Sequence, residues 1–138
     1  MTIRLLAVGM MSAFLGLGLT LGSADARTKR VEVPANKTTI IDSIGVYDAN
    51  YCHSLLSPPK VKKQASQGQI VARWINHEMT QGNCKGRRIK AIVVEYRPKA
   101  GFRGKDEGSI VYRGPQGSRY TESTINHPLS RTYKITVK

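Results

Sequence analysis

Short runs of β-branched and aromatic residues recur along the chain after residue 26, separated by clusters of Gly, Pro and Asn. No segment of this part keeps apolar residues at i, i+3, i+4 and i+7 over three turns, as an amphipathic helix requires. The clearest strand lies at residues 132–138, where Tyr133, Ile135 and Val137 alternate with polar residues. The pattern therefore predicts an all-β domain.

Residues 89–96 form the most continuously apolar run, which predicts a central strand with both faces covered. Residues 114–117 read Gly-Pro-Gln-Gly and are typical of a hairpin turn. Seven or eight short strands at this spacing predict one β-sandwich. The remaining expected strands are residues 30–33, 38–46, 61–64, 69–76, 108–113 and 119–124.

The N-terminal segment has the three-part plan of a secretory signal peptide. Arg4 precedes an apolar run over residues 5–19, and Ala24 and Ala26 supply a small-x-small cleavage pattern. The run is shorter than the roughly 20 apolar residues that span a bilayer. We therefore expect residues 1–26 to be cleaved, leaving residues 27–138 as one periplasmic or secreted domain without a transmembrane span. An uncleaved membrane anchor is the alternative.

Cys52 and Cys84 are the two cysteines of the chain. In an oxidising compartment, an even count without a cluster of metal ligands predicts one disulfide, and two cysteines allow one pairing. The competing interpretation is a catalytic Cys52 thiol activated by His53. Adjacent side chains of an extended segment point to opposite faces, which places His53 poorly for that task.

Residues 93–106 carry a strand-and-loop motif, Val-Val-Glu-Tyr-Arg-Pro-Lys-Ala-Gly-Phe-Arg-Gly-Lys-Asp. The motif resembles the Y-x-P-x-x-G-F-x-G-x-D signature of bacterial immunoglobulin-like and cadherin-like modules, although no aromatic residue directly follows the Asp here. The resemblance implies an immunoglobulin-like sandwich over residues 27–138. The matching positions are Tyr96, Pro98, Gly101, Phe102, Gly104 and Asp106.

The motif residues also have structural interpretations that need no family. Gly101 and Gly104 allow positive φ in a tight loop, Phe102 can cover the end of the sandwich, and Asp106 can accept backbone N–H bonds before the next strand. Related modules in tandem arrays often bind calcium, so Asp106 and Glu107 are possible calcium ligands. A calcium site needs six to eight oxygens, and cations flank these two acids.

Charge is the feature that exceeds what folding requires. The net charge is +13, and removing residues 1–26 takes away one base and one acid and leaves it unchanged. Such a charge predicts attraction to polyanions. Between residues 85 and 105, Glu95 is the one acid among eight bases, one of which is Arg97. The other seven form the predicted anion-binding patch, divided between the two ends of the sandwich: Lys85, Arg87, Arg88, Lys90, Lys99, Arg103 and Lys105. A merely solubilising basic surface is the alternative.

Catalytic signatures are not apparent in the sequence. His53, His77 and His127 lie in separate segments and match no metal-ligand spacing, and no nucleophile elbow or phosphate-binding loop occurs. Trp74 lies in an apolar run, which favours a core anchor over a ligand platform. We expect a non-enzymatic module without metal or cofactor.

The expected partner is an anionic envelope polymer or lipid, or an acidic protein. Nucleic acid is not expected in an exported protein's compartment. The alternative function is a secreted hydrolase or inhibitor acting on cell-wall material, which would require convergent acid and base residues.

Overall fold

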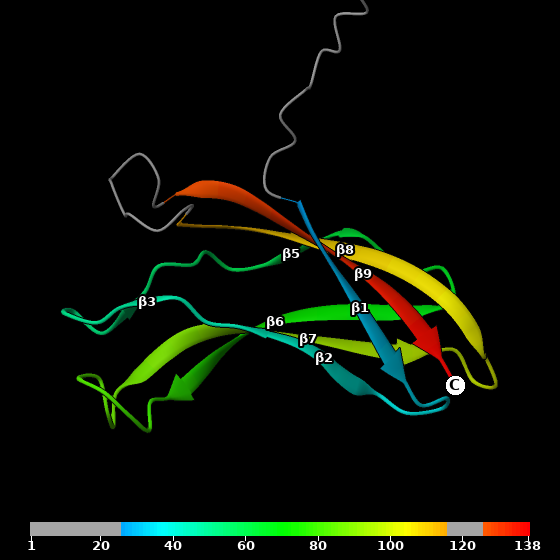
Figure 1. Ribbon diagram of the computed structural model, residues 1–138, viewed down its shortest axis with the longest axis horizontal. Helices are drawn as coiled ribbons and strands as arrows, with labels where there is room; N and C mark the ends of the chain where they lie inside the picture. The colour runs from blue at the N-terminus through cyan, green and yellow to red at the C-terminus, as the bar shows by residue number, and fades with distance from the viewer. Residues whose placement is uncertain (1–25, 116–125) are drawn as a thin grey trace, which may run out of the picture.

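The computed structural model describes residues 26–115 and 126–138, which form nine strands and no helix (Figure 1). Four of the strands are eleven residues long. The strands are β1 (Ala26–Val33), β2 (Thr39–Ile44), β3 (Tyr47–Asp48), β4 (His53–Ser54), β5 (Lys60–Lys63), β6 (Gly68–Glu78), β7 (Arg88–Pro98), β8 (Gly104–Gly114) and β9 (His127–Val137).

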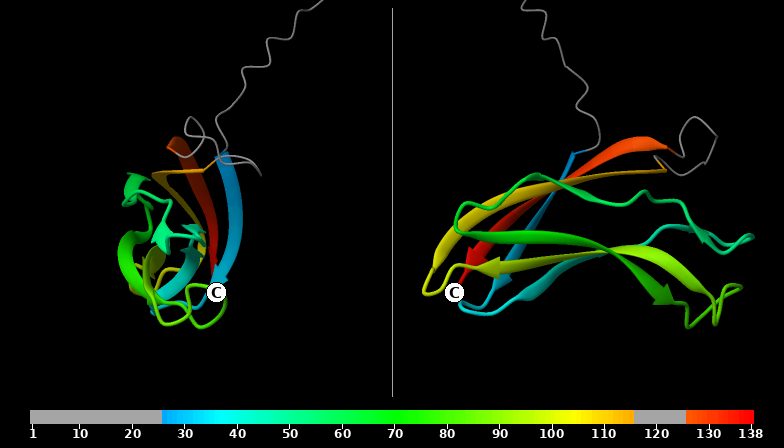
Figure 2. Two further views of the ribbon diagram at one scale, coloured as in Figure 1. Left: turned by 90° about the vertical axis from the view of Figure 1, so that its left-hand side faces the viewer. Right: turned by 180° about the vertical axis from the view of Figure 1, so that it is seen from behind.

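Two sheets pack face to face as a β-sandwich, and Figure 2 shows them as separate layers. The first sheet has the order β1-β9-β8-β5 and the second has the order β2-β7-β6, while β3 and β4 form a small hairpin. All neighbours are antiparallel except β1 and β9, which run parallel from Ala26↔Ser130 to Val33↔Val137. The first and last strands therefore lie side by side (Figure 1).

The predicted all-β sandwich is confirmed, with differences in strand number and length. Two long hairpins account for most of the fold, because β6 pairs with β7 and β8 pairs with β9 along their whole lengths. The segment expected to begin a strand at residue 108 is already in β8 at Gly104. The expected strand at 119–124 and residues 116–117 of the expected turn lie outside the described residues.

Alternation along the long strands builds the core. Tyr96 of β7, Ile110 of β8 and Tyr133 of β9 are fully buried between the sheets, whereas Arg97 and Lys134, which follow the two tyrosines, are exposed. β2 departs from this alternation, because its register with β7 shifts between Ile40 and Asp42. The shift is a β-bulge that turns both Ile41 and Asp42 inward.

A disulfide joins Cys52, in the turn of the β3–β4 hairpin, to Cys84 in the loop between β6 and β7. This confirms the predicted pairing. Trp74 is partly buried and packs against the main core, as expected for an anchor. Within residues 26–115 and 126–138, no helix is long and apolar enough to cross a membrane.

Candidate anion-binding site

A depression of about 530 Å³ crosses the outer face of the four-stranded sheet. Each of its four strands contributes to it, together with the segment that follows β5. We call this depression the cationic groove. Its lining residues are Arg30, Lys63, Gln64, Ser66, Lys105, Asp106, Glu107, Lys134, Ile135 and Thr136.

Strand register brings the cations of the groove together. Arg30 of β1 is the direct neighbour of Lys134 on β9, and Lys105 of β8 is opposite Thr136, two residues further along β9. Direct and diagonal neighbours on one sheet face lie about 5 and 7–8 Å apart. Like charges at such positions destabilise a sheet, so the proximity of Arg30, Lys134 and Lys105 does not by itself stabilise the fold.

Two acidic residues lie on the same face of the sheet, Glu107 of β8 opposite Lys134 and Glu32 of β1 opposite Thr136, and each forms its ion pair with another lysine. Glu32 is paired with Lys138, with Oε2 and Nζ 2.7 Å apart. Glu107 is engaged by Lys63, with Nζ and Oε1 3.1 Å apart. Within the described part of the chain, Arg30, Lys105 and Lys134 have no carboxylate within ion-pair distance. The groove can therefore offer three exposed cations to an anion, with the Thr136 hydroxyl beside them.

Asp106 lines the groove floor, but its carboxylate points into the protein. It accepts hydrogen bonds from the backbone N–H of Ser66, Gln67 and Glu107 at 3.1, 3.0 and 2.9 Å, and from the Tyr96 hydroxyl at 2.7 Å. The Ser66 hydroxyl adds a fifth bond at 3.3 Å. Burial raises the pKa of Tyr96 far above 10, and the Asp106 carboxylate raises it further. Asp106 thus ties β8 to the segment after β5.

The other motif residues also have structural positions. Gly101 and Gly104 have φ of +76° and +135°, as their expected roles in a tight loop require. Phe102 packs partly buried against the core, and Pro98 ends β7. Asp106 accepts the expected backbone bonds, but from within β8 and not ahead of it.

The predicted basic patch is divided by the length of β7. Lys85, Arg87, Arg88 and Lys90 are exposed near the disulfide, while Lys99 and Arg103 are exposed in the β7–β8 loop. An eleven-residue strand separates these ends by about 33 Å. Of the seven predicted residues, Lys105 reaches the groove, whereas Arg30, Lys63 and Lys134 were not expected there.

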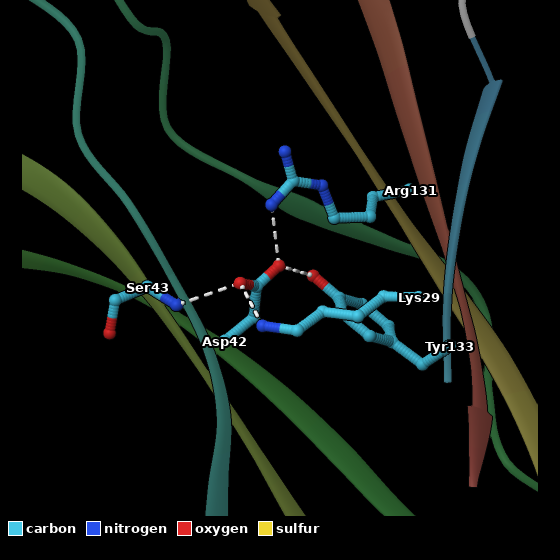
Figure 3. A network of polar contacts seen from close by, with 5 residues as sticks. All are labelled: Lys29, Asp42, Ser43, Arg131 and Tyr133. Carbon is cyan, nitrogen blue, oxygen red and sulfur yellow. Dashed lines mark hydrogen bonds and ion pairs between the residues drawn. The ribbon is translucent and has the colours of Figure 1, made fainter. Parts of the chain in front are cut away.

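A second cluster of charges lies between the sheets around Asp42 (Figure 3). Lys29 and Arg131 donate to its two oxygens at 2.8 and 2.7 Å, and the Tyr133 hydroxyl and the Ser43 N–H donate at 2.9 and 3.0 Å. Burial alone would raise the pKa of Asp42, but the bonds from Lys29, Arg131 and Tyr133 hold it below 3.8. Because these partners occupy the carboxylate, the cluster serves the fold.

The histidines and acids do not gather into a metal site in the described ranges, where no group of three or more His, Cys, Asp and Glu could hold an ion. The two possible calcium ligands, Asp106 and Glu107, point to opposite faces of the sheet, and each is engaged as described above. His53 lies near Tyr51, with ring centroids 6.2 Å apart.

Comparison with known proteins gives no relative. No protein-family model matches the chain, and neither a curated protein nor a solved structure matches it.

Proposed function

We propose that this chain is a non-catalytic, exported immunoglobulin-like module that binds an anionic envelope polymer in the cationic groove. The strand orders β1-β9-β8-β5 and β2-β7-β6 support an immunoglobulin-like arrangement, as does the parallel pairing of the first and last strands. The disulfide supports work in an oxidising compartment. The ligand groups that fit are phosphates or carboxylates.

The observation that carries the proposal is the neighbouring pair Arg30 and Lys134 with Lys105 diagonal to it. A bound phosphate or carboxylate would relieve their mutual repulsion. Arg30 adds a planar fork of donors, which suits a two-oxygen contact with such a group. The groove has a volume of about 530 Å³ and is lined by all four strands of the sheet, so it has room for a segment of such a polymer.

A hydrolase is less well supported by this groove. General acid–base catalysis needs two titratable groups aimed at one substrate. Glu107 is paired with Lys63, and Asp106 is turned inward to five donors. Binding is accordingly the function that the groove geometry favours.

The test compares two double variants with the same change of charge. Arg30→Glu with Lys134→Glu reverses the groove, while Arg87→Glu with Arg88→Glu reverses two exposed cations at the disulfide end. Binding to inorganic polyphosphate and to polyglutamate is measured by calorimetry at several salt concentrations. We expect the groove variant to lose at least about tenfold in affinity, or about 1.4 kcal/mol, and the other variant to lose much less.

Equal losses in the two variants would show a response to net charge alone and would contradict a groove site. Unchanged affinity of a folded groove variant for both polymers would also contradict it. Circular dichroism and thermal unfolding establish that each variant is folded before binding is compared.

A further inference from the structure

β6 forms an open edge of the three-stranded sheet. It pairs with β7 on one side through eleven consecutive residue pairs without a register shift. The edge strand β5 has four residues and a register shift, and the edge strand β2 contains the bulge at Ile41. Short strands and bulges are how proteins protect sheet edges, and β6 has neither.

Hydrogen bonds establish which residues of β6 direct their backbone N–H and C=O groups toward the free edge of the sheet. Ile70 bonds on its free side to the Gln64 side chain, with N to Oε1 at 2.6 Å and Nε2 to the carbonyl oxygen at 3.0 Å. Met79 directly follows β6, and its backbone points toward β7, because its N–H donates to the Arg87 carbonyl oxygen at 2.9 Å. Backbone groups alternate between the two sides of an antiparallel strand. Ala72, Trp74, Asn76 and Glu78 therefore present their N–H and C=O groups at the free edge.

The Gln64 side chain closes this edge at Ile70 and leaves the stretch beyond it open. From Ala72 to Glu78, no edge-facing backbone group has a hydrogen-bond partner in the described part of the chain. An open stretch of this length matches a typical strand of 5–6 residues. Backbone pairing with an added strand would satisfy these groups.

The positive charge beside this open edge indicates what kind of segment would bind there. β5 contacts β6 on this side of the sandwich, and its Lys60 and Lys62 are exposed without an ion-pair partner among the described residues. A second copy of a chain with a net charge of +13 would be repelled. We infer that the open edge of β6 binds an extended acidic segment of another protein by β-strand addition. This inference does not depend on the groove.

The single tryptophan gives a local probe, because Trp74 lies in the open stretch. The ligand for the test is a capped peptide of alternating Glu and Val, about ten residues long, with a Lys and Val peptide as the control. We expect the acidic peptide to change Trp74 fluorescence in a saturable, salt-sensitive way and the basic peptide to have no effect.

Amide hydrogen exchange tests the position of binding. In the free protein we expect the amides of Ala72, Trp74 and Asn76 to exchange faster than those of Arg73 and Ile75, which face β7. The acidic peptide should slow the first three at least about tenfold, whereas polyphosphate should not. Fluorescence changes without protection of these three amides would contradict strand addition.

Two kinds of variant complete the test. Ala72→Pro removes one outward N–H, which an edge strand tolerates, and Asn76→Pro does the same at an exposed position in case the first variant is unfolded. Lys60→Glu with Lys62→Glu reverses the flanking charge, and Lys37→Glu with Arg27→Glu is an exposed control. We expect the proline and β5 variants to bind the acidic peptide at least tenfold more weakly and the control to bind nearly normally.

Unchanged peptide binding by a folded proline variant would overturn the inference. A concentration-dependent dimer that Ala72→Pro or Asn76→Pro abolishes, detected by sedimentation, would also overturn it, because the edge would then bind a second copy.

Discussion

The hydroxyl of Tyr133 on β9 donates a hydrogen bond to the carboxylate of Asp42 on β2, 2.9 Å away in the opposite sheet. Tyr96 of β7 and Asp106 of β8 form the reverse arrangement at 2.7 Å, with the tyrosine in the three-stranded sheet. Both tyrosines are fully buried. Two phenol–carboxylate bonds thus connect the sheets in opposite directions, which restricts sliding of one sheet over the other.

Removing either hydroxyl should destabilise the sandwich. Tyr133→Phe and Tyr96→Phe each delete one hydrogen bond to a buried carboxylate and keep the packed ring. We expect the free energy of unfolding, measured in urea, to fall by about 1.5–3 kcal/mol in each variant. Tyr51→Phe is the control, because Tyr51 is 75% exposed, and it should change stability by less than about 0.5 kcal/mol. A neutral effect of both buried changes would contradict a stabilising role.

Acid should weaken the Asp42 cluster. The hydrogen bonds that lower the pKa of Asp42 in the folded protein are absent after unfolding, so the unfolded chain binds the proton at higher pH. This stabilisation is present above pH 4 and is lost as the pH falls through the lowered pKa. Unfolding measured between pH 2 and 6 should show this loss in the natural protein.

Asp42→Asn provides the comparison. The pH-dependent loss assigned to Asp42 should be missing from this variant, and its unfolding free energy at neutral pH should be lower by about 3 kcal/mol or more, because Arg131 keeps a partly buried charge without its carboxylate. An acid profile parallel to that of the natural protein would assign the titration to other groups.

The disulfide should leave no free thiol in the denatured, unreduced protein. Cys52→Ala with Cys84→Ala releases a loop with a sequence separation of 32 residues, for which chain entropy gives a loss of about 3 to 4 kcal/mol in unfolding free energy. Thiol titration and urea unfolding measure the two expectations. Two titratable thiols per denatured chain would contradict the first.

Gly108 is enclosed in the sandwich. A Cβ at this position would lie 2.9 Å from the Lys63 carbonyl oxygen and would overlap the Ile70 side chain, so Gly108→Ala should cost about 1–3 kcal/mol. Gly45→Ala is the matched control, because its added Cβ meets only Ala91 Cβ at 4.0 Å. Thermal unfolding should show a clear drop for the first variant and little change for the second.

Periodicity predicted the all-β class, the buried face of Tyr133, Ile135 and Val137, and the central position of β7, because these depend on neighbours in sequence. The bulge at Ile41 was not predictable in this way, since it depends on pairing with β7. The same holds for the groove. Arg30 and Lys134 become neighbours because two strands that are distant in sequence pair in parallel. The predicted patch at residues 85–105 was instead based on bases that lie close together in sequence. Lys134 was recognisable as a residue of the polar face of the last strand, but its neighbours were not.

The pairing of β1 with β9 also determines when the four-stranded sheet can be completed during folding. β1 pairs with β9, which lies about a hundred residues later in the chain. Asp42 also depends on β9, because Arg131 and Tyr133 of that strand donate hydrogen bonds to its carboxylate. Until the last strand has been synthesised, the N-terminal segment lacks its neighbour and a buried carboxylate lacks two of its donors. Closure at such separation makes folding slow relative to helical proteins of this size. A nascent chain of this kind stays incompletely folded until β9 has left the ribosome, because the pairing of β1 and two hydrogen bonds between the sheets depend on that one strand.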